Sequence, residues 1–408
     1  MQPTALLDPN GAVPDRREAR RTLAVAGFNH ALHDGYTDLI YLMLPIWQTE
    51  FALSYGLLAA MRALYACAMA GLQVPVGRLA GRVGGKTLLA LGTTLSACGY
   101  LLAGLSSGVP GLGAALVLSG AGSSTQHPIA SAAVSRAFGT RARGPLGIYN
   151  FSGDLGKAAI PGLLSLLLIV MAWRHTLLLL GLGGLLVAAM VILAMPRNHG
   201  DRTQAVSREQ PGREAGEVSG GRGGFAVLLA IGILDTAVRM GLLTFLPFVL
   251  RAKGASIPLN GLALTLVFVG GAAGKFACGW LGARAGTLRT VLVTEGGTAA
   301  CIVAVLLLPL TPAMVLLPLL GVMLNGTSSV LYGTVPELTP AHRAEHAFAV
   351  FYTGTIGSGA IAPVLYGFLG DALGPNAATV ATAMSAIAIL PLALALAPHL
   401  SERRQPPV

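Results

Sequence analysis

Charged residues are scarce in this sequence. Asp, Glu, Lys and Arg make up 11% of the 408 residues, against about 25% in a typical soluble domain, while apolar residues make up 54%. This composition excludes a soluble globular protein. Apolar stretches long enough to cross about 30 Å of hydrocarbon recur along nearly the whole chain, whereas the strands of a membrane barrel would alternate and be about half as long. We therefore expect an integral membrane protein that is built from helices.

Cysteines are also few, and all four lie inside apolar stretches, where we expect packing residues rather than disulfides or metal ligands. They are Cys67, Cys98, Cys278 and Cys301. No cluster of His, Cys and carboxylates has the spacing of a metal site, and no nucleophile elbow is present. The residues around Lys86 resemble the end of a phosphate-binding loop, but Ala80 replaces its first glycine. We therefore expect neither an enzyme nor a bound cofactor, and no use of ATP.

The net charge of +10 is not spread evenly but falls on alternate loops. One set of loops carries Arg16, Arg17, Arg20, Arg21, Arg78, Arg82, Lys86, Arg136, Arg141, Arg143, Arg197, Arg202, Arg208, Arg213, Arg222, Arg403 and Arg404. The opposite loops carry only Arg174, Arg251 and Lys253. This positive-inside pattern predicts a bacterial inner membrane protein with both termini in the cytoplasm, and it argues against nucleic acid as the partner of the basic residues. The first twenty residues lack an apolar core, so we expect no cleavable signal peptide.

Hydropathy predicts twelve membrane spans in two groups of six. The spans are 22–48, 56–79, 87–106, 110–136, 144–170 and 174–195, then 224–250, 258–281, 288–309, 312–335, 344–370 and 376–398. The corresponding domains are a cytoplasmic segment 1–21, a first bundle 22–195, a mobile polar linker 196–223, a second bundle 224–398 and a cytoplasmic tail 399–408.

The two groups of spans also resemble each other in sequence. The segment from Gly77 to Gly84 matches the segment from Gly279 to Gly286 at an offset of 279 − 77 = 202 residues. Nearly the same offset relates Pro45 to Pro247, Asp34 to Asp235, Gly153 to Gly354 and Gly156 to Gly357. A parallel repeat of six-helix units predicts two bundles related by an axis along the membrane normal, with a binding site between them.

Ionisable residues inside the spans are the candidates for that site, because an isolated charge there costs roughly 2.5 to 3.5 kcal/mol on insertion scales. Four acids and four bases are found: Asp34, Asp38, Asp154 and Asp235, with Arg62, Lys157, Arg239 and Lys275. Spacing along the helix predicts the pairs Asp235–Arg239 and Asp154–Lys157, either as part of the mechanism or simply as self-neutralised pairs that permit insertion. Asp34 and Asp38 have no basic residue of their own at pairing distance and are the better proton carriers.

His30 lies one helical turn before Asp34. It either passes a proton to Asp34 or forms a fixed hydrogen bond that holds the helix in place. The bases would balance these charges and attract an anionic substrate, whose oxygens suit guanidinium groups.

Several motifs resemble those of the major facilitator superfamily. Gly77 to Lys86 follows the pattern G-x-L-x-x-R-x-G-G-K of its signature loop, and a degenerate copy ends at Gly286. More narrowly, the His30/Asp34 spacing, the run PIWQTEF from Pro45 and the run GSSTQHP from Gly122 resemble fosmidomycin-resistance transporters. The resemblance implies twelve helices in the fold of that superfamily, with the fourth span lining the cleft.

The resemblance adds two groups of candidate residues. Gln126 and His127 are expected to join the substrate path, although a histidine in such a place is also a common packing residue. The second group is the cytoplasmic gate loop, Gly77, Arg78, Arg82, Gly84, Lys86 and its counterpart Arg284. Gly81 and Ala283 stand where the superfamily usually has an acidic residue, so the gate must close through other contacts.

We therefore expect a monomeric secondary transporter that works by alternating access and binds a small-molecule substrate and protons within the lipid bilayer. The favoured reading is a proton-driven exporter (an antiporter) of a small polar or anionic compound similar to fosmidomycin, powered by the proton gradient. The main alternative is a symporter that imports a small anionic metabolite with protons. A membrane sensor or scaffold that does not transport is a more remote alternative, because it would not need so many balanced charges.

Overall fold

The computed structural model describes residues 16–196, 222–339 and 344–401. Most of the predicted linker 196–223, of the predicted segment 1–21 and of the predicted tail 399–408 lies outside these ranges. The described part of the first half contains α1 (Arg16–Phe51), α2 (Tyr55–Val83), α3 (Gly85–Leu105), α4 (Val109–Ser123), α5 (Ser131–Phe138), α6 (Arg143–Val170) and α7 (Trp173–Ala194). The second half contains α8 (Arg222–Ala252), α9 (Ile257–Ala285), α10 (Thr287–Leu307), α11 (Leu310–Thr334), α12 (Ala344–Leu373) and α13 (Pro375–Ser401).

Eleven of the predicted spans each overlap one of these helices, the fourth overlaps a broken helical segment, and the described residues contain no strand. In the described ranges, ten helices are long and apolar enough to cross a membrane. Two further segments complete the predicted twelve. One is α1, whose polar residues lower its mean hydropathy, and the other is the broken segment α4–η1–α5. The prediction of an all-helical membrane protein with a two-fold internal repeat is confirmed.

The fourth segment is broken where the sequence places Pro128. A π-helix, η1 (Gln126–Ala130), separates α4 from α5. Proline lacks a backbone N–H and cannot continue the regular ladder, and short π-helical turns of this kind are frequent at functional sites. The break therefore gives the segment around His127 a different backbone geometry from that of its neighbours.

The internal repeat is visible in the ends of equivalent helices. Ser54 caps α2 by accepting a hydrogen bond from the backbone N–H of Leu57, and Ser256 caps α9 in the same way. The helices α2 and α9 both end at a glycine with positive φ, +90° at Gly84 and +82° at Gly286. Only glycine adopts this backbone conformation without steric cost, which explains why both copies of the motif end on it.

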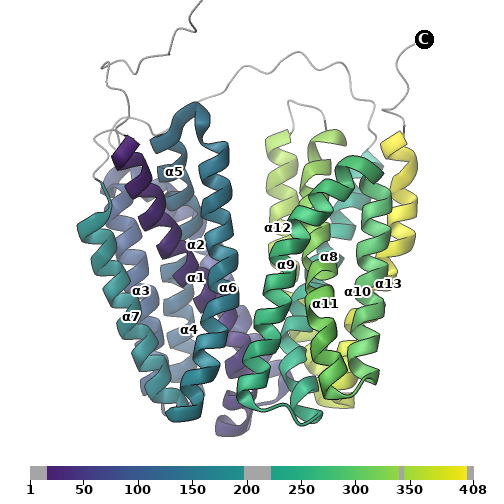
Figure 1. Cartoon of the computed structure of the whole chain (residues 1–408), viewed down its shortest axis with the longest axis horizontal. Helices are drawn as coiled ribbons and strands as arrows, with labels where there is room; N and C mark the ends of the chain where they lie inside the picture. The colour runs from purple at the N-terminus through teal and green to yellow at the C-terminus, as the bar shows by residue number, and fades with distance from the viewer. Residues whose placement is uncertain (1–15, 197–221, 340–343, 402–408) are drawn as a thin grey trace, which may run out of the picture.

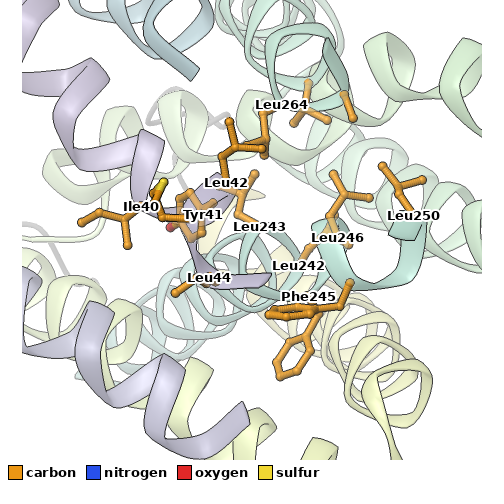
Figure 2. Packing of buried hydrophobic residues seen from close by; sticks show 14 of the residues in the cluster. Ile40, Tyr41, Leu42, Leu44, Leu242, Leu243, Phe245, Leu246, Leu250 and Leu264 are labelled. Carbon is orange, nitrogen blue, oxygen red and sulfur yellow. The ribbon is translucent and has the colours of Figure 1, made fainter. Parts of the chain in front are cut away.

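The two halves stand side by side, and the chain ends that the structure describes lie at the same end of the molecule (Figure 1). In the C-terminal thirds of α1 and α8 the halves are joined by a buried apolar cluster. Figure 2 shows Tyr41, Leu44, Leu242, Leu243 and Phe245 in this cluster, and all five side chains are nearly inaccessible. Burial of this apolar surface holds the halves together by packing.

Polar contacts add to this junction at the end remote from the chain ends. The carboxylate of Asp371 on α12 accepts hydrogen bonds from the backbone N–H groups of Tyr55 and Gly56, at 2.6 and 3.0 Å. Arg251 at the end of α8 donates to the carbonyl oxygen of Pro45, at 3.1 Å. At the opposite end the bundles diverge (Figure 1), and the side chains of Arg78 and Arg82 are exposed.

Candidate functional site

A cavity of about 210 Å³ lies between the two halves, near the middle of the helices. It contains seven of the eight predicted ionisable residues: Asp34, Asp38, Arg62, Asp154, Lys157, Arg239 and Lys275. The remaining wall includes Thr37, Met69, His127, Met240, Leu243, Phe268 and Asn325. Because both halves contribute charged groups, any relative movement of the halves changes the geometry of this site.

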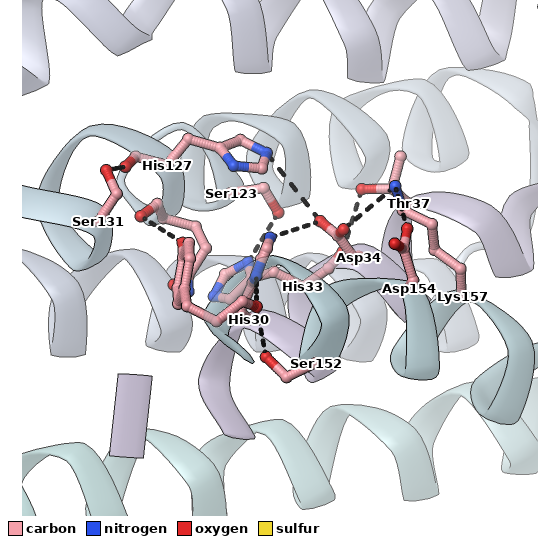
Figure 3. A network of polar contacts seen from close by, with 12 residues as sticks. His30, His33, Asp34, Thr37, Ser123, His127, Ser131, Ser152, Asp154 and Lys157 are labelled. Atoms are coloured by element: carbon pink, nitrogen blue, oxygen red, sulfur yellow. Dashed lines mark hydrogen bonds and ion pairs between the residues drawn. The ribbon is translucent and has the colours of Figure 1, made fainter. Parts of the chain in front are cut away.

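Asp34 on α1 is the centre of the polar contacts on the first-half side of the cavity (Figure 3). Its Oδ1 lies 3.4 Å from Nε2 of His30 and 4.0 Å from Nε2 of His127. Its Oδ2 lies 3.2 Å from Nζ of Lys157 on α6. The expectation that Asp34 has no basic partner is therefore wrong, since the partner comes from another helix. The prediction holds better for Asp38, which has no basic nitrogen within ion-pair distance among the described residues.

Asp154 and Lys275 form an ion pair across the cavity. Nζ of Lys275 on α9 donates to Oδ1 of Asp154 on α6 at 2.6 Å, so the contact joins the two halves. The predicted pair between Asp154 and Lys157 is present only at 4.0 Å. The predicted pair is therefore present, but each of its two residues makes a shorter contact elsewhere.

The two arginines of the cavity differ in their partners. Arg239 pairs with Asp235 at 3.1 Å, as their spacing on α8 predicts. Arg62 instead donates to the sulfur of Met240 at 3.2 Å and stacks 4.9 Å from the ring centroid of Tyr41. In the described part of the chain Arg62 has no carboxylate within ion-pair distance, so it is well placed to meet an anion.

Asp235 itself does not line the cavity, although the sequence predicted it on the substrate path. It is buried, it pairs with Arg239, and it lies near Glu295, a residue of α10 that is only 2% exposed. Sequence reasoning missed Glu295, and the balance of four acids against four bases is thus incorrect. A single glutamate inside the apolar stretch 288–309 was the signal that pointed to it.

Gln126 is another predicted path residue that lies away from the cavity. Its side-chain oxygen accepts a hydrogen bond from Asn29 at 2.7 Å, and its nitrogen donates to the hydroxyl of Tyr149 at 3.4 Å. These buried contacts connect η1 with α1 and α6, so Gln126 positions the helices. The neighbouring His127 points into the cavity instead, and about half of its side chain is exposed.

His30 is held by a residue that sequence reasoning also missed. Its Nδ1 lies 2.8 Å from the carbonyl oxygen of Tyr149, and its ring stacks on the Tyr149 ring with the centroids 4.2 Å apart. The contact with Asp34 does not have the geometry of a hydrogen bond, because Nε2 of His30 is left without a hydrogen-bond partner. The fixed hydrogen bond that the sequence offered as an alternative is therefore absent, and nothing in the linear sequence singled out Tyr149.

His33 belongs to a second, fully buried set of contacts behind this site. Its ring nitrogens lie 3.0 Å from the hydroxyl of Ser123 and 3.1 Å from that of Thr93. Tyr65 reaches the same serine at 2.8 Å and also contacts Thr37 at 3.0 Å. This network ties α1, α2, α3 and α4 together and fixes the rotation of α1, which directs Asp34 and Asp38 toward the cavity.

The predicted gate residues lie at the end of the molecule where the bundles diverge. Gly77, Arg78 and Arg82 are on the last turns of α2, Gly84 ends that helix, Lys86 is on the first turn of α3, and Arg284 is at the end of α9. The guanidinium of Arg284 lies 4.3 Å from the ring centroid of Trp280 on its own helix. A gating role for these residues stays a prediction.

The fold also assembles a set of donors that metal ions use. Nitrogen and oxygen atoms of His30, Asp34 and His127 lie within 4.8 Å of one another. The sequence suggested no metal site, because His127 is far from the other two along the chain and only folding brings it to Asp34. No cysteine takes part in this group.

Comparisons with known proteins agree with this architecture. A sequence profile of the Major Facilitator Superfamily matches residues 26–230 and 227–408. The fosmidomycin resistance protein of Escherichia coli (strain K12) is 24% identical over 371 residues, which cover 88% of this chain and 90% of that protein. A probable L-galactonate transporter of the same strain is 26% identical over 175 residues, which cover 42% of this chain and 38% of that protein. This second match thus spans well under half of the relative.

Solved structures with the same fold are also found. A bacterial homologue of the human lysosomal transporter Spinster, in an inward-facing and occupied conformation, superposes with a TM-score of 0.78 at 16% identity. The alignment covers 98% of this chain and 100% of that one. A nucleoside transporter superposes with a TM-score of 0.76 at 12% identity, covering 93% of this chain and 99% of that one. The profile match over nearly the whole chain, together with the repeat and the cavity between its halves, shows that this protein is a membrane transporter of the Major Facilitator Superfamily.

Proposed function

We propose that this transporter exports a small polar or anionic compound in exchange for protons, by alternating access. The observation that carries the proposal is Asp38, a carboxylate on the cavity wall without a basic partner within ion-pair distance among the described residues. A proton on Asp38 removes its negative charge, which weakens its interaction with a hydrogen-bond donor or a cationic group of the substrate. A proton that arrives at Asp38 from outside thus displaces the substrate, which is the exchange that an antiporter requires.

The bases of the cavity supply the second part of the substrate site. Arg62 lacks a carboxylate partner in the described structure, and Lys157 and Lys275 are only partly buried. Together they would bind an anionic group on a substrate whose hydrogen-bond donors reach Asp38. A phosphonate such as fosmidomycin has this character, and the similarity to a fosmidomycin resistance protein supports the same substrate class.

The arrangement of the two halves supports an inward-facing state. Contacts through Asp371 and Arg251 close the end remote from the chain ends, while the predicted gate residues at the other end are exposed. With both termini in the cytoplasm, as the positive charges predict, the cavity is then accessible from the cytoplasmic side. Export would begin with substrate binding in this state.

A proton-coupled importer of a small anion is a second candidate, and one contact favours it. Lys157 lies 3.2 Å from Asp34, so a proton on Asp34 would release Lys157 to bind an anion. Proton and anion would then travel together. The partial similarity to a probable L-galactonate transporter fits an anionic substrate of this kind.

Proton movement in everted membrane vesicles separates the two candidates. Respiration acidifies the vesicle interior, a pH-sensitive dye reports it, and fosmidomycin or L-galactonate is then added outside. Antiport makes the interior more alkaline, whereas symport makes it more acidic. Asp38→Asn is expected to abolish the antiport response, while Glu50→Gln, which removes an exposed carboxylate at the end of α1, serves as the matched control. Absence of any response in the wild type with both compounds would contradict the proposal.

A further inference from the structure

The imidazole of His30 has an unused lone pair directed at a carboxylate. A carbonyl oxygen only accepts hydrogen bonds, so the 2.8 Å contact with Tyr149 requires that Nδ1 of His30 carries the hydrogen. Nε2 of the neutral ring is then an acceptor. It lies 3.4 Å from Oδ1 of Asp34, which is also an acceptor, and it has no hydrogen-bond partner. Two acceptors at this distance require a cation between them or beside them.

His127 adds a third donor on the open side of this pair. Its Nε2 lies 4.0 Å from the same oxygen of Asp34, and its ring centroid lies 5.3 Å from that of His30. Two imidazoles and one carboxylate are a common ligand set for zinc and neighbouring divalent metals. Ligand atoms around tetrahedral zinc are about 3.3 Å apart, as bond lengths of about 2.0–2.1 Å dictate. His30 and Asp34 already have about this separation, and Nε2 of His127, which lies 4.0 Å from Asp34, must move about 0.7 Å closer.

We propose that His30, Asp34 and His127 bind one divalent first-row transition-metal ion, such as Zn²⁺, that enters from the cavity. The remaining coordination position faces the cavity, where the side chain of His127 is about half exposed. The site is pre-organised in the way that metal sites usually are, because His30 donates its other ring N–H to a backbone carbonyl. Stacking on Tyr149 and close packing against Gly153 further fix the ring.

Lys157 is the competitor of the metal. Its ammonium contacts the other carboxylate oxygen of Asp34 at 3.2 Å and would repel a divalent cation. Asp154 lies 4.0 Å from the same ammonium and offers it an alternative partner. Metal binding is therefore coupled to a shift of Lys157 away from Asp34, and removal of Lys157 should strengthen binding.

Zinc binding to the purified full-length transporter tests this inference. The protein carries an affinity tag without histidine, is treated with a chelator, and is titrated with Zn²⁺ against a zinc-sensitive dye. We expect one ion per chain in the wild type, binding at least about tenfold weaker in His127→Ala and Asp34→Asn, and binding at least about tenfold tighter in Lys157→Ala. His175→Ala, which removes an exposed histidine outside the cavity, should bind as the wild type does.

Spectroscopy with Co²⁺ identifies the ligands directly. We expect a visible absorption band in the wild type and in His175→Ala that is lost in His127→Ala. Equal zinc binding in all the variants would show that the ion is held elsewhere and would overturn the inference. Failure of both the wild type and Lys157→Ala to bind would mean that only a proton occupies the pair, which would also overturn it. Because binding is measured without transport, the result does not depend on the proposed exporter function.

Discussion

Asp34 on α1 and Asp235 on α8 occupy equivalent places in the internal repeat, but their surroundings differ. Asp34 faces the cavity and is contacted by two histidines and Lys157. Asp235 is closed in by Arg239 on its own helix and by the buried Glu295. One aspartate can exchange partners with solvent and substrate, whereas the other is enclosed. We therefore predict that Asp34 matters more for transport than Asp235 does.

The packing of the same helices differs between the halves as well. A Cβ atom on Gly156 of α6 would lie 1.9 Å from the carbonyl oxygen of Ala31 on α1, whereas one on the equivalent Gly357 of α12 would meet no atom within 4 Å. In the second half, a largely apolar pocket of about 480 Å³ lies between α8 and α12. The helix that bears Asp34 is therefore held more tightly than its counterpart.

The largest expected effect is the difference in transport between two variants at equivalent positions, Asp34→Asn and Asp235→Asn. Asp34→Asn should reduce substrate-evoked proton movement at least about 100-fold, because it removes one of the carboxylates that face the cavity and leaves Lys157 without its nearest partner. Asp235→Asn should reduce it less than about tenfold, because Asp235 does not line the cavity. The measurement is the vesicle assay with matched expression. Equal losses would remove the functional distinction between the halves.

The next effect is on stability and tests the packing difference. Gly156→Ala should destabilise the protein by at least about 2 kcal/mol, because the added methyl group would meet backbone that cannot move aside. Gly357→Ala should stabilise it by about 0.4–1 kcal/mol, because open space accepts the methyl group and alanine restricts the unfolded chain. Thermal unfolding in detergent, followed by tryptophan fluorescence, gives the comparison. Similar midpoints for the two variants would contradict the difference in packing.

A further effect on stability distinguishes the buried ion pair Asp235–Arg239 from the contacts of Lys157, which is shared between Asp34 and Asp154. Arg239→Met should cost up to about 3 kcal/mol, because Asp235 and Glu295 lose their base inside a buried site. Lys157→Met should cost less, since Lys157 is partly exposed and Asp154 keeps Lys275. The double variant Asp235→Asn/Arg239→Met should recover much of the loss in the unfolding midpoint. Strictly additive effects would show that the pair is not coupled.

The smallest effect concerns a contact that one half of the repeat makes and that has no counterpart in the other half. Asp371 of the second half accepts hydrogen bonds from the start of α2, while the equivalent position in the first half, 371 − 201 = 170, is Val170. Asp371→Asn should lower stability by about 1 kcal/mol or less, because a charge-assisted contact at a helix start becomes neutral. Val170→Ala is the matched control, with no expected change in this contact. An unchanged unfolding midpoint in Asp371→Asn would show that apolar packing alone closes this end.

Most of the fold was accessible from sequence because it depends on local properties. Span lengths follow from hydropathy and bilayer thickness, and the ends at Gly84 and Gly286 follow from the conformational freedom of glycine. Seven of the eight predicted ionisable residues meet in one cavity because a charge inside a span must face protein or water. The Asp235–Arg239 pair was predicted because both residues lie on one helix.

The partners across helices depended on the tertiary structure alone. Lys157 contacts Asp34, Lys275 contacts Asp154, and His127 approaches His30, in each case between segments far apart in the chain. Such contacts are set by how each helix is rotated and how closely it approaches its neighbour. The linear sequence contains neither the rotation nor the distance. Gln126 and Asp235 were therefore predicted on the substrate path, although neither lines the cavity.

The sequence by itself determined the class of protein, the number of spans and the internal repeat, because composition and periodicity act over a few turns of helix. The tertiary structure decided which carboxylate shares a base, which histidine has a free nitrogen and which half is packed tightly. Those outcomes follow from contacts such as that of Gly156 with the backbone of Ala31, which bring helices to fixed distances and rotations. The energy of a charge pair depends on the distance between its two groups, so the packing of the helices determines which charged residues pair.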